Sequence, residues 1–161
     1  MLNISMVRVD ERLVHGQIII KWLEAKKVNR IIVIDDDSAS NPVIGKVMRM
    51  SIPNDIKLEI YNLEDGIKVL LTQENDDVII LAKHLWIVKK IYEKGGNIKE
   101  VNVGRIPTDI GRRMVCTNVF LSTEDIDIIK YFSEEGINVF VQAVPDSIPI
   151  NLFELVSKVN S

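Results

Sequence analysis

Cysteine, histidine and excess basic charge are scarce in this sequence, and each shortage excludes a class of protein. The single cysteine, Cys116, has no partner for a disulfide within the chain. No second histidine or cysteine lies near His15 in the sequence, so a zinc site there is not expected. Twenty Lys and Arg against 23 Asp and Glu give a net charge of -3, which does not favour nucleic-acid binding.

Long hydrophobic runs are also missing. The longest apolar stretches, such as residues 18–20 and 78–82, fall far short of the ~20 residues that a membrane-spanning helix requires. The first residues, MLNISMVRVD, contain no basic region followed by an apolar stretch of signal-peptide length. We therefore expect a cytoplasmic protein with no membrane span of its own.

What the sequence has is a regular alternation of two patterns. With 161 residues and 47% apolar composition, residues 1–161 suit one domain with a proper core. Short β-branched runs alternate with segments of helical period, which predicts an α/β fold: a three-layer, open, mainly parallel sheet with helices on both faces. Strands are expected near residues 4–9, 30–35, 57–61, 78–81, 100–103 and 138–142, and helices near 16–26, 41–50, 63–73, 85–94, 124–135 and 152–159.

One interval, residues 103–125, breaks this alternation. It contains two glycines, a proline and the strand-like run RMVCTNVFL, and it has no helical period. We expect an extra strand here, antiparallel at the edge of the sheet, with Cys116 as a small buried hydrophobic residue within it. Ser122 or Thr123 then caps the next helix, with Glu124 or Asp125 in its first turn.

In open α/β sheets, ligands bind beyond the carboxyl ends of the strands. The loops expected at that edge are residues 10–15, 35–38, 83–84, 104–105 and 144–147. Only the first combines several kinds of chemistry, in the segment VRVDERLVHGQIIIKW. By the two-residue period of a strand, Arg8 and Asp10 share one face, and two charges there need to be paired or at the rim. A structural ion pair and a functional role are both open for Asp10.

His15 directly precedes Gly16, which opens the predicted helix. The first amides of a helix have no intrahelical partners, so those of Gly16 and Gln17 favour an anion or a phosphoryl group on His15. Arg12 adds a planar fork of donors for phosphate oxygens. Most single histidines are structural, but no metal, nucleotide or serine-hydrolase motif competes here. The residues alone therefore predict an anion-binding histidine at a strand-to-helix turn, and they leave a nucleophilic role open.

Other polar residues near strand ends have simpler interpretations. His84 follows Lys83, and helix packing is the favoured role for its ring, while Lys83 is a candidate phosphate or partner contact. The acidic run DDDS at residues 35–38 resembles a metal cluster, yet acidic side chains are common at helix starts. We expect neither a metal nor a cofactor.

The segment VRVDERLVHGQIIIKW resembles, almost residue for residue, the N-terminal signature of the IIB components of the mannose/fructose/sorbose family of the bacterial sugar phosphotransferase system (PTS). The likeness extends to IIVIDDDSASNPV and to STEDI…EEGINVFVQAVP. It implies that His15 carries the phosphoryl group, accepted from a IIA partner. It further implies donation to a sugar of the mannose, fructose, sorbose or N-acetylgalactosamine class that enters through the membrane components IIC and IID.

Further expectations follow from this resemblance. The activity is that of a protein-Nπ-phosphohistidine–sugar phosphotransferase, located in the cytoplasm and associated with the inner face of the membrane through IIC and IID. Asp10 or a backbone carbonyl is expected to fix the tautomer of His15. Many relatives carry Gly-Gly where this chain has Gly104 followed by Arg105, so the local loop shape is expected to differ. The alternative is a non-catalytic regulatory or anion-binding module on the same fold.

The basic residues predict how a partner docks. An electropositive rim around His15 attracts a partner with an acidic active face in spite of the net negative charge. Arg8 is also a candidate phosphate ligand beside Arg12, Gly16 and Gln17. The expected rim consists of Arg8, Arg12, Lys83, Arg105, Arg112 and Arg113.

Overall fold

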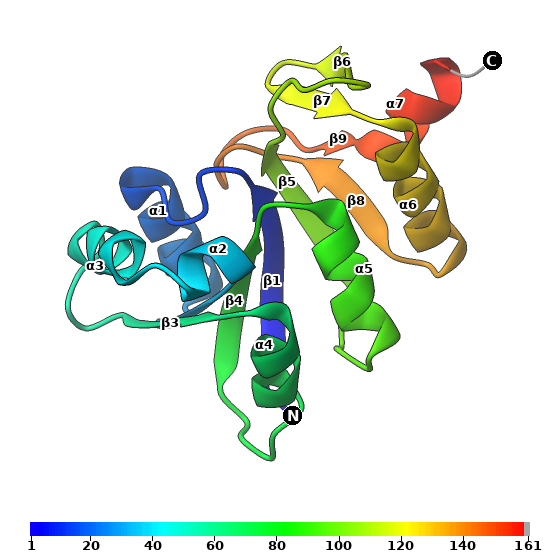
Figure 1. The fold of residues 1–161 in the computed structure, drawn as a ribbon. Helices are drawn as coiled ribbons and strands as arrows, with labels where there is room; N and C mark the ends of the chain where they lie inside the picture. The colour runs from blue at the N-terminus through cyan, green and yellow to red at the C-terminus, as the bar shows by residue number, and fades with distance from the viewer. Residues whose placement is uncertain (160–161) are drawn as a thin grey trace.

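The computed structural model describes residues 1–159 and has the expected mixed α/β architecture (Figure 1). The central sheet has seven strands in the order β3-β2-β4-β1-β5-β8-β9. Every neighbouring pair from β3 to β8 is parallel, and β9 runs antiparallel to β8. The strands are β1 (Asn3–Asp10), β2 (Arg30–Ile34), β3 (Lys57–Tyr61), β4 (Asp77–Ala82), β5 (Glu100–Arg105), β8 (Asn138–Val141) and β9 (Ile150–Asn151).

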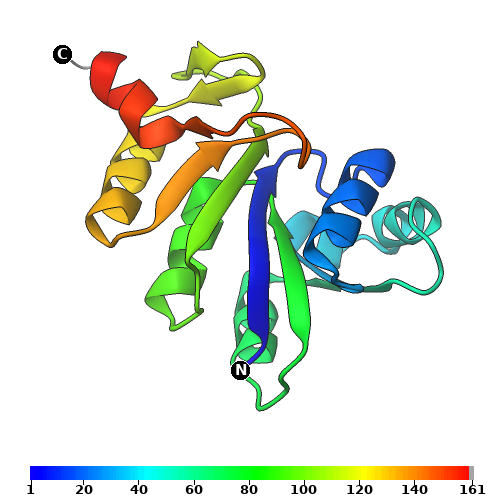
Figure 2. The ribbon, with the colours of Figure 1, turned by 180° about the vertical axis from the view of Figure 1, so that it is seen from behind.

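Helices cover both faces of the sheet, as Figures 1 and 2 show from opposite sides. One core cluster joins α1 (Gly16–Lys26) and α3 (Pro42–Met50) to one face of the sheet. The other joins α4 (Leu63–Leu70), α5 (Leu85–Glu93), α6 (Thr123–Glu134) and α7 (Leu152–Val159) to the opposite face. A short helix α2 (Asp36–Ala39), which the sequence pattern did not predict, follows β2.

The two-residue period of the strands decides which side chains meet which helices. In β1, Val7 and Val9 belong to the core under α5 and α6, whereas Met6 belongs to the core under α1. Arg8 and Asp10 therefore share one face of β1, as expected, and it is the face that α1 covers. Strands β2 and β4 are buried along nearly their whole length, which explains why their sequences are apolar on both faces.

The interval after β5 differs from the expectation. It forms a separate two-stranded antiparallel hairpin, β6 (Arg113–Cys116) and β7 (Val119–Leu121), tied to the end of β5 by a bridge between Ile106 and Val119. The antiparallel edge strand exists, but β9 supplies it. The expected place for it within RMVCTNVFL was wrong because that run turns back on itself at Asn118, which has a positive φ of 64°.

The structure also tests two local expectations for this interval, the cap of the next helix and the burial of Cys116. Ser122 caps α6 with a reciprocal pair of bonds: its Oγ accepts from the Asp125 amide at 3.1 Å, and Asp125 Oδ2 accepts from the Ser122 amide at 2.9 Å. Cys116 is only partly buried at the end of β6, and this burial raises the pKa of its thiol.

Candidate functional site

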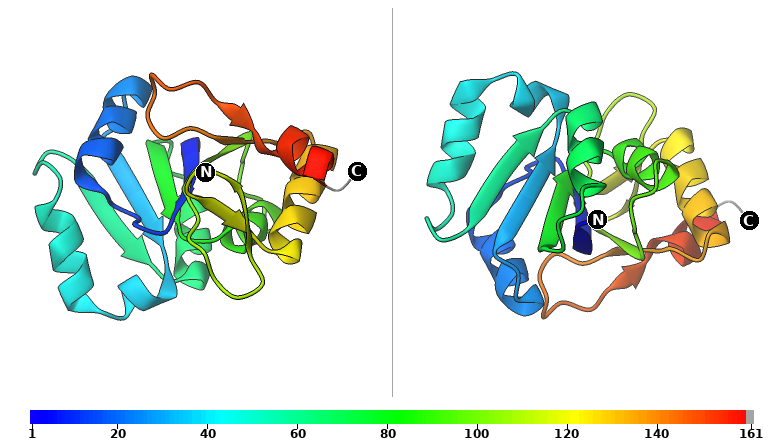
Figure 3. Two further views of the ribbon diagram at one scale, coloured as in Figure 1. Left: turned by 90° about the horizontal axis from the view of Figure 1, so that it is seen from above. Right: turned by 90° about the horizontal axis from the view of Figure 1, so that it is seen from below.

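The loop from β1 to α1 lies at the carboxyl edge of the sheet, seen from above in the left panel of Figure 3. It begins with a turn in which the Leu13 amide donates to the Asp10 carbonyl at 3.0 Å. Leu13 has a left-handed backbone, with φ of 54°, and its side chain is buried in the core under α1. A non-glycine residue in this conformation carries strain, so burial of the leucine anchors the loop.

His15 occupies the N-cap of α1 with an extended backbone. Its carbonyl accepts from the amides of Ile18 and Ile19 at 3.0 and 3.1 Å, which starts the helix. The imidazole is exposed, makes no capping bond, and has no hydrogen-bond partner among residues 1–159. The amides of Gly16 and Gln17 likewise have no acceptor within the described chain. The ring and two helix-start donors are therefore free at one point of the surface.

Asp10 holds Arg12 in a fixed orientation. Arg12 Nε donates to Asp10 Oδ1 at 2.9 Å and Arg12 Nη2 donates to Oδ2 at 2.7 Å, while the Arg12 amide also donates to Oδ1 at 3.0 Å. These bonds raise the pKa of Arg12. The expected contact between Asp10 and the His15 ring is not made, because Arg12 and Arg8 occupy the Asp10 oxygens. No backbone carbonyl contacts the ring either, among the residues described.

The expected place of Arg8 in the rim and on the phosphate was wrong. Its side chain is 2% exposed, below the surface on which His15 lies. Nη1 donates to Asn102 Oδ1 and to the Gln142 carbonyl, and Nη2 donates to the Ala143 carbonyl and to Asp10 Oδ2. Burial lowers the pKa of Arg8, and the Asp10 charge opposes that shift. Arg8 is therefore a buried strut under Asp10.

The strut depends on residues that sequence reasoning missed. Asn102 is fully buried on β5 beside β1, and the Trp22 indole of α1 lies 5.7 Å from the Arg8 guanidinium carbon while its Nε1 donates to the Ala143 carbonyl at 3.1 Å. Gly104 leaves the space for the pair, because a Cβ there would lie 2.6 Å from Arg8 Cζ. One signal was available: Asn102 is a polar residue between two valines, Val101 and Val103, at a strand position expected to be buried.

The other residues expected in the rim differ in exposure and in their partners. Arg105 is 44% exposed and its Nε lies 2.9 Å from Glu11 Oε1, next to Arg12 in sequence. Lys83, at the end of β4, pairs with Asp35 at 3.4 Å. Arg112 is largely buried and donates to the Pro107 carbonyl at 3.0 Å, so it does not belong to the rim.

Arg113 is exposed on β6, on the hairpin that Figure 1 shows across the molecule from α1. Its expected place in a rim around His15 is therefore not supported by the position of the hairpin. Together with the positions of Arg8 and Arg112, this leaves a smaller set of cations that are partly or fully exposed. We define the basic rim as Arg12, Lys83 and Arg105.

His84 has the packing role that was favoured for it. His84 occupies the N-cap position of α5, but its side chain makes no capping hydrogen bond. Its half-buried ring stacks on the ring of Trp86, with centroids 6.1 Å apart. Burial lowers the pKa of His84, with a further contribution from Arg112.

The acidic run after β2 is occupied by structural bonds. Asp35 accepts from the amide and hydroxyl of Ser38, and Asp36 Oδ1 accepts from the Leu63 amide. Among residues 1–159 there is no group of three or more His, Cys, Asp or Glu side chains placed to hold a metal ion. The free groups at His15 include the N–H donors of Gly16 and Gln17, a kind of group that is chemically suited to an anion.

Known proteins resemble this chain in sequence and in fold. Residues 4–161 match the family model described as the PTS system sorbose subfamily IIB component. The N-acetylgalactosamine-specific phosphotransferase enzyme IIB component 1 of Escherichia coli K12 is 28% identical over 145 residues, covering 89% of this chain and 92% of that protein. The fructose-specific EIIB component of Bacillus subtilis is 26% identical and covers 90% of each.

A third relative is longer. The mannose-specific EIIAB component of E. coli K12 is 27% identical over 159 residues, and this chain spans 49% of its length. Among solved structures, the IIBSor domain of the sorbose permease from Klebsiella pneumoniae has the same fold, with a TM-score of 0.91, 23% identity and 97% of each chain covered. The E. coli N-acetylgalactosamine-specific IIB component 1 gives a TM-score of 0.84 at 26% identity, with 92% and 99% covered.

Within residues 1–159 no helix combines the length and apolar character needed to cross a bilayer. The family model matches residues 4–161, and the fold agrees with the solved IIB structures. The chain belongs to the sorbose subfamily of IIB components, the mannose/fructose/sorbose family of the sugar phosphotransferase system.

Proposed function

We propose that this protein is a phosphocarrier whose His15 accepts a phosphoryl group from a IIA phosphohistidine and passes it to a sugar of the mannose, fructose, sorbose or N-acetylgalactosamine class. The single observation that carries the proposal is the unpartnered His15 ring at the start of α1, beside two free amides and an oriented Arg12. The same site without transfer would be the regulatory, anion-binding module, which the experiment below distinguishes.

Arg12 is arranged for this chemistry by the way Asp10 holds it. The guanidinium has two edges that each present a pair of donors. Asp10 occupies the Nε–Nη2 edge, and the remaining Nη1–Nη2 edge has no partner in the described structure. That edge is available to two phosphoryl oxygens in the transition state, when charge develops on them.

The step itself requires little beyond positioning. A ring nitrogen of His15 forms a bond to phosphorus while the bond to the nitrogen of the IIA histidine breaks. The amides of Gly16 and Gln17 and the positive end of the α1 dipole stabilise the transferred oxygens. Because these donors are fixed by the helix and by Asp10, they need no rearrangement during transfer.

The proposed partners follow from the family. In this proposal the donor is a IIA protein and the acceptor sugar enters through the membrane components IIC and IID. The chain would then act in the cytoplasm, at the inner face of the membrane. One relative of this chain, the mannose-specific EIIAB component, is named for both an A and a B part. No cofactor or metal takes part in the proposed step.

The test is to incubate the protein with a phosphorylated IIA component of the same transport system and to map the modified residue by mass spectrometry under alkaline conditions. We expect one acid-labile, base-stable phosphoryl group on His15 and none on His84. His15→Ala is expected to abolish transfer with nearly unchanged thermal stability, because the exposed ring has no structural bond. Phosphate on another residue, or none, contradicts the proposal.

A further inference from the structure

Helix α3 presents apolar side chains to solvent. Val43, Val47 and Met50 are 68%, 62% and 85% exposed. Their spacing of four and three residues places them on one side of the helix. The opposite side buries Met48 and packs Ile44 against the core under α1, so the solvent-facing stripe is additional to the core contacts. Three large apolar side chains in a row on one exposed helix mark an interaction surface.

A groove beside this stripe extends the apolar surface. It has a volume of about 620 Å³ and lies between α3 and β3, the strand at the free edge of the sheet. Its lining contains no acidic residue, while Lys46 and Arg49 are basic. The lining residues are Pro42, Gly45, Lys46, Arg49, Met50, Leu58 and Ile60. We call Val43, Val47 and these lining residues the α3 patch.

The α3 patch lies next to the proposed phosphoryl site. Ser51, the C-cap of α3, is so close to the start of α1 that a Cβ on Gly16 would be 3.4 Å from the Ser51 carbonyl oxygen. The two helices lie side by side in Figures 1, 2 and 3. Met50 directly precedes Ser51, and from it the stripe runs about 10 Å along the helix to Val43. A protein bound at His15 is therefore within reach of the patch.

We propose that the α3 patch is the docking surface for the IIA phosphoryl donor, which meets it with apolar side chains ringed by Asp and Glu. The inference rests on the proposed function of His15. Charge favours this occupant, because the groove lining has two basic and no acidic side chains. The cations of the basic rim add less, since each is paired with an acid of this chain. A second copy of this chain would bring Lys46 and Arg49 against their own counterparts. A small patch also suits a complex that has to separate after each transfer.

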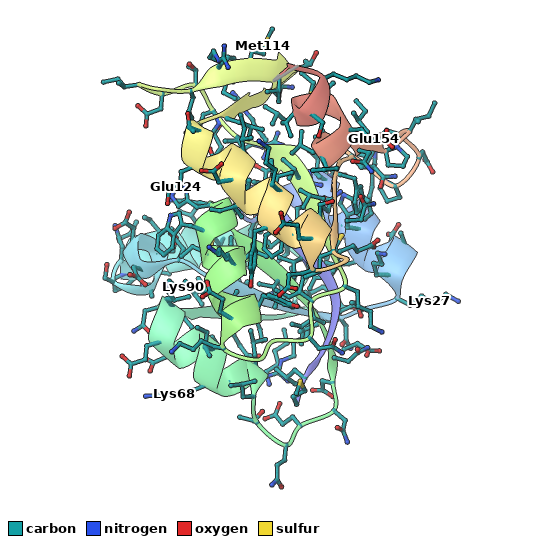
Figure 4. All side chains as sticks on the ribbon, turned by 90° about the vertical axis from the view of Figure 1, so that its right-hand side faces the viewer. Lys27, Lys68, Lys90, Met114, Glu124 and Glu154 are labelled. Carbon is teal, nitrogen blue, oxygen red and sulfur yellow. The ribbon has the colours of Figure 1, made fainter. Side chains whose placement is uncertain are left out.

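The experiment compares two exposed methionines. Met50→Glu puts an acid into the patch, and Met114→Glu makes the same change on the β6–β7 hairpin, where Met114 is 65% exposed (Figure 4). In pre-steady-state transfer from the phosphorylated IIA protein, Met50→Glu is expected to raise the half-saturating donor concentration by about tenfold or more. The maximal rate at saturation should stay within about twofold, and Met114→Glu should match wild type in both.

The variant Met50→Lys tests whether the docking face of the IIA donor is acidic. Because the proposed donor face is acidic, this variant should raise the half-saturating concentration much less than Met50→Glu. Equal effects of Lys and Glu would overturn the charge argument, and an unchanged half-saturating concentration in both variants would overturn docking at the patch. Dissociation of a wild-type dimer by Met50→Glu in sedimentation, with transfer unchanged, would assign the patch to a second copy instead.

A small donor separates this inference from the proposed function. Phosphoramidate transfers its phosphoryl group to accessible histidines without a docking protein, so Met50→Glu and wild type should react with it at the same rate. If wild-type His15 is phosphorylated by neither phosphoramidate nor the IIA protein, the proposed function fails and the docking inference fails with it. If both donors phosphorylate His15 but Met50→Glu retains wild-type kinetics with IIA, only the docking inference fails.

Discussion

Arg12 is the residue on which the proposed chemistry depends most directly after His15. The planar guanidinium holds Asp10 with one edge and leaves another pair of donors for the phosphoryl oxygens. Lysine carries the same charge on a flexible stem, but it has neither edge. A conservative substitution therefore separates geometry from charge at this position.

For Arg12→Lys we expect slower transfer with little change in the affinity for the unphosphorylated donor. A hydrogen bond to a charged group contributes about 1.5 to 3 kcal/mol, so losing one that strengthens in the transition state slows transfer by roughly tenfold to a hundredfold. Single-turnover rates beside separately measured donor binding check this. Equal rates for Arg12→Lys and wild type would mean that Arg12 acts as a point charge or only supports the loop.

Gly104 is the residue at which the buried strut is most sensitive to a single added carbon. A Cβ would overlap Arg8 and Asp10. The position of Arg8 is fixed by Asn102 and by the carbonyls of Gln142 and Ala143, just after β8. Gly104→Ala is expected to lower the free energy of unfolding by about 1 to 3 kcal/mol, because overpacking in a buried site forces its neighbours out of place. Urea denaturation measures the loss, and transfer from IIA should fall with it because Asp10 positions Arg12.

The matched control for that substitution is Gly45→Ala on α3. A Cβ there would lie 3.5 Å from Ile60 Cδ1, which is an ordinary van der Waals contact. Alanine also has a higher helix propensity than glycine. Its free energy of unfolding should equal or exceed that of wild type. Equal stability of the Gly104→Ala and Gly45→Ala proteins would contradict this prediction. It would mean that Arg8 moves to make room for the Cβ of Ala at position 104, so that its position is less rigid than the hydrogen bonds suggest.

At the scale of elements, the sequence predicted most of the fold because local periodicity decides it. Every parallel strand and all the longer helices were expected, since apolar runs and caps such as Ser122 are read from neighbouring residues. The hairpin β6–β7 was missed because a turn at Asn118 divides what reads in the sequence as one strand-like run. The burial of Arg8 could not be read locally, because its partners Asn102 and Gln142 lie 94 and 134 residues away.

The site was predicted in the same uneven way. The segment around His15 is continuous in sequence, so its helix-start geometry could be anticipated. The different roles of Arg8 and Arg12 could not, because they depend on β5 lying next to β1 and β8 lying next to β5. Arg105, which stands where many relatives have a second glycine, contacts the β1–α1 loop. Its side chain pairs with Glu11, and its carbonyl accepts from the Glu11 amide at 3.0 Å.

A second charge network fastens the amino ends of β2 and β3, far from His15 along the strands. Arg30 is nearly buried and binds Glu59 at 2.6 Å, with Glu74 and Asp76 at 2.7 and 2.9 Å. Tyr61 donates to Glu59 at 2.5 Å. Burial alone would raise the pKa of Glu59, but the bonds from Arg30 and Tyr61 outweigh it and lower that pKa below 4.5, while the pKa of Tyr61 rises to about 12.

The lowered pKa of Glu59 predicts how stability depends on pH. A carboxylate with a lowered pKa in the folded state stabilises that state above its unfolded pKa, and the contribution is lost as pH falls through the folded value. Part of the stability at neutral pH should therefore disappear below about pH 4.5. In thermal unfolding at several pH values, Glu59→Gln should show a smaller loss from neutral to acidic pH than wild type. Parallel curves for the two proteins would contradict this role for Glu59.

At the scale of the whole molecule, the charge distribution departs from the net charge of -3. The basic rim and the basic side chains of the α3 patch lie on the His15 side of the molecule, whereas the acidic partners of Arg30 lie at the opposite ends of the strands. Exposed charges act over about 8 to 10 Å at moderate salt. Each cation of the basic rim has an acidic partner in this chain, Asp10, Asp35 or Glu11, so the excess positive charge on this side comes from Lys46 and Arg49 of the α3 patch.

This asymmetry predicts that salt weakens association with IIA more than it affects the chemical step. Below saturation, the transfer rate should fall by roughly threefold to tenfold between low and moderate ionic strength, because electrostatic steering is screened. At saturating donor the rate should change little. Arg105→Ala removes the most exposed cation of the basic rim and should reduce the salt dependence, while Lys68→Ala on α4, whose exposed partner is Glu64, should leave it unchanged. If subsaturating rates were the same at both ionic strengths, the donor would dock through apolar contacts alone, and the basic rim would serve only the phosphoryl group.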